Sequence, residues 1–161
     1  MPTRGKYAAF RALDPFFEIV LKGLAGLVDG GHFFDIMADD LVFESRYDLP
    51  GWPRMIRGPA ALMNALSGYG ENIKLLSSDG LIVHRCEDAR VVIIEYEVHG
   101  KVVATGIPYD NRLISVITIE NRKISHWRDY MDSLSPWLAL NEEPRLVVGN
   151  AGAVDRCDGS C

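Results

Sequence analysis

The chain has 161 residues, of which 48% are hydrophobic and 24% are charged, the proportions of a single globular domain. Its net charge of −5 argues against nucleic acid or an anionic membrane as a partner, because both attract basic surfaces. No stretch approaches the ~20 apolar residues that cross a bilayer, and residues 1–5 lack the apolar core of a signal peptide. We therefore expect a cytoplasmic protein.

The three cysteines are too few, and odd in number, for a disulfide framework. Cys86 stands at the start of a strand-like run. Cys157 and Cys161 lie in a tail that offers no further ligands at a spacing suited to a metal ion. The histidines form no pair with ligand spacing to a carboxylate, so we predict no metal and no cofactor.

The first part of the chain has the periodicity of helices. Residues 14–28 carry apolar side chains at every third or fourth position, with Pro15 in the first turn and the glycine pair 30–31 as a stop. Short helices are expected over residues 32–38 and 60–66.

Strands follow, beginning at residues 41–47, where apolar and polar positions alternate. Residues 48–53 form a turn-rich loop. Further strands are expected over residues 73–84, 90–99, 105–120 and, after a turn at residues 121–122, 123–132. Helices that precede a meandering antiparallel sheet are typical of the α+β class. We predict one domain over residues 1–141 and a loosely ordered tail over residues 142–161.

The last strand contains the side chain most suggestive of chemistry. Read with period two, Trp127, Asp129 and Met131 share one face. A carboxyl group between an indole and a thioether has its neutral form favoured, so its pKa rises toward the range that suits general acid–base catalysis. The alternative is a structural carboxylate that pairs with Arg90, Arg112 or a backbone amide.

The strand over residues 90–99 has one apolar face and one charged face. Glu95, Glu97 and His99 lie on the charged face. If that face lines a pocket, Glu95 approaches Asp129 and the two carboxyl groups share a proton. If it meets solvent or a dimer partner, these side chains are surface charges.

Aromatic and flexible side chains near the expected pocket are candidates for substrate contact. Tyr47, Trp52, Met55 and Tyr109 are placed at the pocket mouth, with residues 49–53 either as a lid or as a plug of the core. The Tyr109 hydroxyl can donate to a carbonyl oxygen or a developing oxyanion.

Parts of the chain resemble the SnoaL-like group of the nuclear transport factor 2-like superfamily. They are residues 33–44 (FFDIMADDLVFE), 111–119 (NRLISVITI) and 123–132 (KISHWRDYMD). The resemblance covers residues 15–140 and implies a cone-shaped α+β barrel, in which N-terminal helices pack on a curved, mostly antiparallel sheet around an apolar pocket. The group includes ketosteroid isomerases, polyketide cyclases, limonene-type epoxide hydrolases, PhzA/B phenazine-biosynthesis proteins and members without catalysis. Fold alone therefore does not settle the reaction.

Carried over residue by residue, the resemblance implies a catalytic acid at Asp129. Limonene-type epoxide hydrolases have an aspartate there, but their arginine and second aspartate correspond to Glu95 and Glu97 here, and their tyrosine and asparagine fall near Phe43 and Ser45. The base of ketosteroid isomerases also corresponds to Ser45. PhzA/B proteins have a glutamate at the position of Asp129 and use it to shuttle protons, and this chain departs least from their pattern.

We therefore predict a cofactor-independent acid–base enzyme, an isomerase, cyclase or dehydratase, that acts on a hydrophobic cyclic small molecule. Asp129 is the predicted proton shuttle, with Glu95 and Tyr109 as helpers. The predicted substrate contacts are Phe43, Tyr47, Trp52, Met55, Trp127 and Met131. Two alternatives stay open: an epoxide hydrolase with an altered acid set, and a non-catalytic small-molecule-binding module. Each is expected to form a homodimer through the outer face of the sheet.

Overall fold

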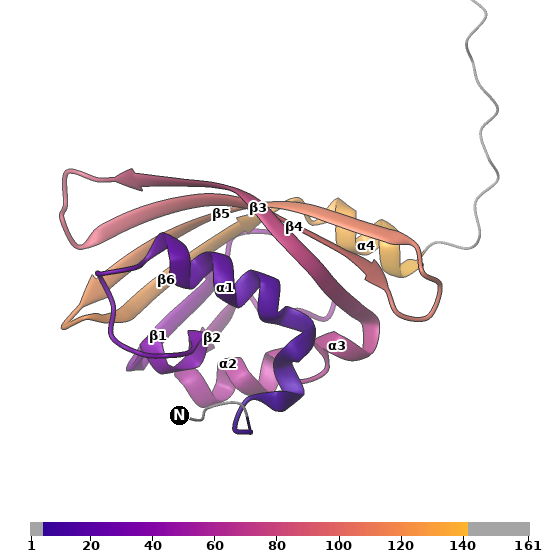
Figure 1. The fold of residues 1–161 in the computed structure, drawn as a ribbon, viewed down its shortest axis with the longest axis horizontal. Coiled ribbons are helices and arrows are strands. Elements are labelled where there is room, and N and C mark those ends of the chain that lie inside the picture. The colour runs from indigo at the N-terminus through magenta and orange to yellow at the C-terminus, as the bar shows by residue number, and fades with distance from the viewer. Residues whose placement is uncertain (1–4, 142–161) are drawn as a thin grey trace, which may run out of the picture.

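One open sheet of six strands organises the part of the chain that the computed structural model describes, residues 5–141. In chain order the elements are η1 (Ala8–Leu13), α1 (Asp14–Gly23), η2 (Phe33–Ile36), β1 (Met37–Ser45), β2 (Met55–Arg57), α2 (Pro59–Leu66), α3 (Tyr69–Asn72), β3 (Ile73–Arg85), β4 (Val91–Val102), β5 (Pro108–Glu120), β6 (Lys123–Met131) and α4 (Leu134–Asn141). The strand order is β2-β1-β6-β5-β4-β3, so β1 and β6 lie side by side although they are far apart in the chain (Figure 1).

The sheet is antiparallel except between β1 and β6, which run parallel. The four strands from β3 to β6 form the meander that the sequence predicts. β5 and β6 are joined by a two-residue turn in which Asn121 and Arg122 have φ angles of 50° and 61°. Positive φ at both central residues matches the right-handed twist of a hairpin, so the turn predicted at residues 121–122 is confirmed.

Irregular pairing curves the sheet toward one side. On β3 the register shifts between Leu75 and Ser77 and again between Asp79 and Ile82. Such bulges bend a strand and strengthen its twist. In Figure 1 the sheet wraps over α1 and α2, and this cone-shaped α+β arrangement is the one that the resemblance implies.

The concave side of the sheet contains the core, in which aromatic rings surround Trp127 of β6. The indole is fully buried. Its centroid lies 5.6 Å from that of Phe33, 5.8 Å from that of Phe43 and 6.3 Å from that of Phe16. Rings at such distances pack edge-on or offset. The three rings come from η2, β1 and α1, so Trp127 connects the N-terminal elements to the centre of the sheet.

Boundaries near the N-terminus differ from the prediction. α1 begins at Asp14 as expected, but it ends at Gly23 rather than near residue 28, because the chain turns at Gly26, whose φ is +81°. The helix predicted over residues 32–38 is a single 3-10 turn, since Met37 already pairs with β6 as the first residue of β1. β2, α3 and α4 were not predicted, because β2 and α3 have only three and four residues and the apolar side chains of α4 do not gather on one face.

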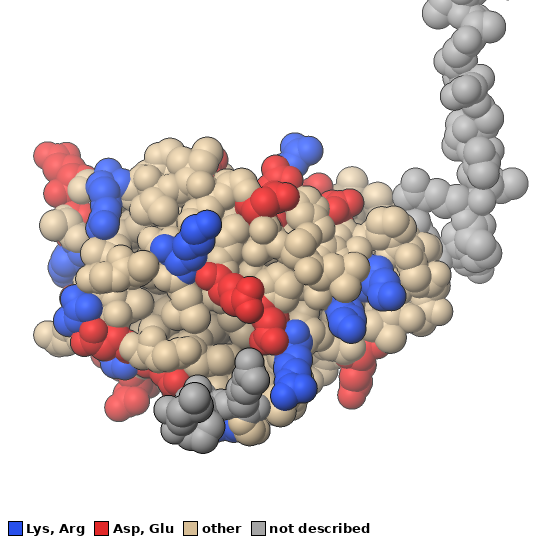
Figure 2. Space-filling view, viewed as in Figure 1, with Lys and Arg blue, Asp and Glu red and all other residues tan. Residues whose placement is uncertain are grey.

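Several predictions about location and assembly are not tested by the fold. No helix within residues 5–141 is long and apolar enough to cross a membrane. Figure 2 shows acidic and basic side chains interspersed over the face that it presents. The tail predicted over residues 142–161, with Cys157 and Cys161, lies outside the described residues. The domain boundary, the cytoplasmic location and the homodimer stay predictions.

Gly100 lies where β4 passes the first bulge of β3, and its lack of a side chain allows the two strands to meet. A Cβ at this position would lie 2.3 Å from the Lys74 carbonyl oxygen, a backbone atom. We predict that Gly100→Ala lowers the free energy of unfolding by about 2 kcal/mol or more, as overpacking does, measured by urea denaturation. Gly68→Ala is the matched control, because a Cβ there meets nothing within 4 Å. Equal stability of the two variants would contradict this account.

Candidate active site

A cavity of about 420 Å³ lies between the concave face of the sheet and the helices. Its wall is largely apolar and aromatic, with side chains that include Leu13, Phe16, Phe33, Leu75, Val98 and Leu113. Glu71, Asn72 and Leu140 also line the cavity and are exposed to solvent. α3 and α4 therefore border its opening.

Asp129 lies in the wall of this cavity, at the middle of the sheet. On one side it pairs with Ser45 of β1, and on the other with Ser115 of β5. Asp129 lies on the same face of β6 as Trp127, which packs into the core, so its carboxyl group points to the concave side of the sheet and the residue is 5% exposed. The structure thus places Asp129 in an apolar cavity, with a serine from each neighbouring strand beside it.

The two carboxylate oxygens of Asp129 have different surroundings. Oδ1 accepts hydrogen bonds from Ser115 Oγ at 2.9 Å and from Trp127 Nε1 at 3.1 Å. Ser115 Oγ also lies 3.0 Å from the Tyr96 hydroxyl. No side chain of the described residues donates to Oδ2, and none of their fully enclosed polar atoms is without a partner. Oδ2 is therefore open to the cavity.

The pKa of Asp129 follows from this environment. Burial raises it from 3.8 to about 6, while the hydrogen bonds from Trp127 and Ser115 oppose the rise by favouring the charged form. A carboxyl group with this pKa both accepts and donates a proton readily near neutral pH.

Three tyrosines, Tyr47, Tyr69 and Tyr109, also line the cavity. Burial raises the pKa of all three, and the negative charge of Asp129 adds to the rise for Tyr47 and Tyr109. The Tyr109 hydroxyl accepts a hydrogen bond from Asn111 Nδ2 at 2.9 Å, which leaves its own proton for another acceptor. All three hydroxyls remain protonated at neutral pH and can donate to an oxygen atom of a bound molecule.

Most of the residues predicted from the sequence meet in this cavity. Besides Asp129 and Tyr109, its wall includes Phe43, Tyr47, Trp52 and Met131. Trp52 donates its indole N–H to Ser45 Oγ at 2.8 Å. This bond connects the loop after β1 to the strand position next to Asp129, so the loop forms part of the wall.

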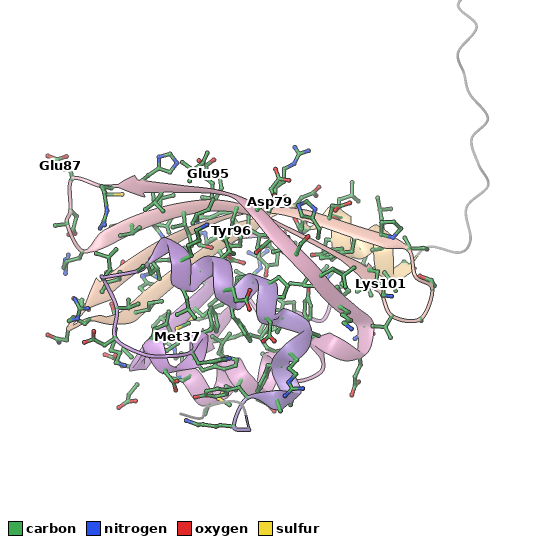
Figure 3. The ribbon with its side chains drawn as sticks, viewed as in Figure 1. Met37, Asp79, Glu87, Glu95, Tyr96 and Lys101 are labelled. Carbon is green, nitrogen blue, oxygen red and sulfur yellow. The ribbon has the colours of Figure 1, made fainter. Side chains whose placement is uncertain are left out.

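The predicted approach of Glu95 to Asp129 is wrong. Glu95 lies on the outer face of β4, where its Oε2 is 2.6 Å from Nε2 of His84 and its side chain is 40% exposed. In Figure 3 the Glu95 side chain lies on the side of the sheet away from α1, whereas Tyr96 lies on the helix side. The apolar face of β4, with Val92, Ile94, Tyr96 and Val98, packs toward the core, and because side chains alternate along a strand Glu95 lies on the opposite face.

Two predicted substrate contacts are also corrected. Met55 is 46% exposed on the short edge strand β2 and does not line the cavity. Trp127 is fully enclosed by other rings and likewise does not line it. Its indole N–H donates a hydrogen bond to Asp129 Oδ1. Trp127 therefore positions the carboxyl group from behind the cavity wall.

Sequence reasoning missed the residues of α3 and two polar residues of β5. Tyr69, Glu71 and Asn72 come from a helix of four residues that has no periodic signal. Ser115 and Asn111 are the buried polar residues of β5. Their spacing of four, on the same face as Leu113 and within an apolar strand, is a signal that could have identified both positions.

One group of possible metal ligands lies on the outer face, away from the cavity. Ligand atoms of Asp79, Glu97 and His99 lie within 4.8 Å of one another. These side chains are engaged in surface ion pairs: His99 Nδ1 is 2.6 Å from Asp110 Oδ1, and Glu97 lies 3.8 Å from Arg112. The ion pairs account for the grouping.

Comparison with known proteins gives matches along most of the chain. The SnoaL-like domain family matches residues 16–127. "Uncharacterized protein YesE" of Bacillus subtilis (strain 168) is 35% identical over 100 residues, which cover 62% of this chain and 68% of that protein. A crystal structure of a candidate isomerase from Bacillus subtilis is 29% identical, with a TM-score of 0.65 and coverage of 84% of this chain and 94% of that one.

A phenazine biosynthesis-related protein from Pseudomonas aeruginosa has a similar structure, with a TM-score of 0.59. It covers 93% of this chain and 94% of its own, at 18% identity. At that identity the likeness shows a shared fold only.

Removal of the Ser115 hydroxyl should raise the pKa of Asp129. The hydroxyl donates to the ionised carboxylate, so in Ser115→Ala the charged form loses one of its two donors. We expect a pKa about 1 higher than in the unaltered protein, measured by NMR titration of the carboxyl carbon. Ser77→Ala, on the exposed part of β3, is the control and should leave the value unchanged. An unchanged pKa in Ser115→Ala would contradict the geometry of this hydrogen bond.

The raised pKa of Asp129 also has a consequence for stability. Between pH 4 and pH 6 the unfolded chain releases this proton while the folded protein retains it, so stability falls as the pH rises through that window. A difference of about 2 in pKa corresponds to about 3 kcal/mol. Asp129→Asn cannot titrate, so relative to the unaltered protein it should gain about that much between pH 4 and pH 7 in urea denaturation. A pH-independent difference between the two proteins would show that Asp129 titrates normally.

Proposed function

Because the chain belongs to the SnoaL-like domain family, we propose that it is a cofactor-independent acid–base enzyme that isomerises, cyclises or dehydrates a hydrophobic cyclic carbonyl compound. The observation that supports this most directly is the state of Asp129. One buried carboxyl group presents a single open oxygen to an apolar cavity, and neutral tyrosine hydroxyls lie in the same wall. The likeness to a candidate isomerase agrees with this reading.

The proposed reaction begins with proton removal by Asp129. Oδ2 takes a proton from the carbon next to a carbonyl group. The electrons of the broken C–H bond form a carbon–carbon double bond, and the π electrons of the carbonyl group move onto its oxygen to give an enolate. Ser115 and Trp127 donate hydrogen bonds to Oδ1 and so fix the orientation of the carboxyl group, with Oδ2 toward the substrate. Return of the same proton to a different atom completes an isomerisation.

The tyrosines supply the second requirement, which is stabilisation of the enolate oxygen. A neutral hydroxyl that lies in an apolar wall donates strongly to a developing negative charge. Tyr47 and Tyr109 both lie near enough to Asp129 for its charge to raise their pKa values. One of these hydroxyls is therefore the proposed donor to the carbonyl oxygen.

An epoxide hydrolase of the limonene type needs a cation and a second acid beside the catalytic aspartate. The matching residues here, Glu95 and Glu97, lie on the outer face of β4. No arginine is found among the described residues that line the cavity. The observations therefore favour proton transfer over hydrolysis as the proposal.

We predict that the protein catalyses exchange of the α-hydrogens of 2-tetralone, a hydrophobic cyclic ketone, for deuterium in D2O, observed by NMR. Asp129→Asn should slow this exchange by about 100-fold or more, the usual contribution of a general base. The rate constant kcat/KM should rise through about pH 6 and then level off, because Asp129 must be ionised to accept the proton.

Tyr47→Phe and Tyr109→Phe identify the proposed oxyanion donor, and the more harmful change should cost about 100-fold. Met55→Leu, on the exposed edge strand, is the control that should retain full activity. Full exchange by Asp129→Asn would overturn the proposal. Tight binding of the ketone without any hydrogen exchange would favour the alternative that the protein is a non-catalytic small-molecule-binding module.

A further inference from the structure

The cavity has an unusual distribution of charge. Among the described residues that line it there is no lysine, arginine or histidine, while two carboxyl groups, those of Asp129 and Glu71, are present. The arginines of the central strands point away: Arg112 and Arg128 alternate with the inward-facing residues of β5 and β6, and the Arg112 side chain is 87% exposed. A molecule inside the cavity therefore meets negative charge and hydroxyl groups, but no positive side chain.

From this distribution we infer that the cavity selects uncharged carbonyl compounds and rejects their anionic counterparts. The inference rests on the proposed function, which it deepens by defining the substrate class. The substrate would carry one hydrogen-bond acceptor, placed against the tyrosine hydroxyls and Asp129, and an apolar ring body with no carboxylate, phosphate or sulfate group.

The physical argument begins with desolvation. An anion that enters an apolar cavity loses its hydration, and this cost is recovered only where a cation or several donors replace the water. The tyrosine hydroxyls can replace part of the hydrogen bonds that the anion loses from water. Ionised Asp129 opposes the entry of an anion, because two negative charges a few ångströms apart repel each other strongly where little water screens them.

A ketone avoids both costs. Its oxygen carries only partial charge and is satisfied by one or two hydroxyl donors, for which Tyr47, Tyr69 and Tyr109 are available. Its ring body replaces water against Phe16, Phe43 and the other apolar side chains of the wall. Two fused six-membered rings with a short carbonyl substituent are a suitable size for a cavity of about 420 Å³.

The test uses two probes of almost equal shape, 2-acetylnaphthalene and 2-naphthoate, which differ in a methyl ketone against a carboxylate. Binding of each to the unaltered protein is measured by isothermal titration calorimetry at pH 8, where Asp129 is ionised. We expect the ketone to bind at least about tenfold more tightly than the carboxylate. In Asp129→Asn, which removes the charge, the carboxylate should gain at least about tenfold while the affinity for the ketone changes little.

Ala65→Trp supplies the control for location, because Ala65 lines the cavity from α2 and a larger side chain there occupies its space. This variant should lose ketone binding. Equal or tighter binding of the carboxylate by the unaltered protein would overturn the inference, and so would failure of the ketone to bind up to its solubility limit. A ketone preference in a protein that shows no hydrogen exchange would sustain the charge selectivity and refute the proposed catalysis, so the two failures are distinguishable.

Discussion

The parallel pairing of β1 with β6 is the contact on which the site depends. Without it, β6 would be the edge of an antiparallel meander, and the backbone beside Asp129 would face water. With it, β6 has neighbours on both edges, and the carboxyl group lies between Ser45 of β1 and Ser115 of β5. Trp127, two residues earlier on the same strand, packs against rings from α1, η2 and β1 and donates its N–H to the carboxylate. Trp127 and Asp129, two residues apart on β6, thus connect the aromatic core to the candidate site.

The period of two along each strand separates the charges of the protein into two environments. On the outer face the histidines pair with carboxylates, as in His84 with Glu95 and His126 with Glu44. The His84–Glu95 pair is exposed to water, where such interactions contribute little to stability, and the His126–Glu44 pair is partly buried. On the inner face the same strands present apolar side chains, tyrosines and one acid. The cavity therefore has a low dielectric, and its single buried carboxyl group keeps a pKa of about 6.

Hydrogen bonds between polar side chains fix the orientation of the groups around the cavity. Ser115 and Trp127 satisfy one oxygen of Asp129, Asn111 donates to Tyr109, and Trp52 donates to Ser45. Hydrogen bonds of this kind restrain side-chain rotation and so hold the remaining donors and acceptors in fixed directions. Among the described residues that surround Asp129, one carboxylate oxygen and the tyrosine hydroxyl protons remain for a bound molecule, and proton transfer next to a carbonyl group requires both.

The sequence alone determined the fold class, the meander from β3 to β6, the turn at residues 121–122 and the inward face of β6, because period-two alternation and turn residues are local properties. It also placed Asp129 between apolar neighbours on one face. Only the tertiary structure decided which other side chains join it. Alternation along β4 is consistent with either of its faces toward the cavity. The face that carries Glu95 lies outward because the sheet curves toward the side on which the helices pack. Tyr69 and Glu71 reached the cavity on a helix of one turn, and Ser115 reached Asp129 across a strand pair, since contacts between residues distant in the chain depend on register, which no local pattern specifies.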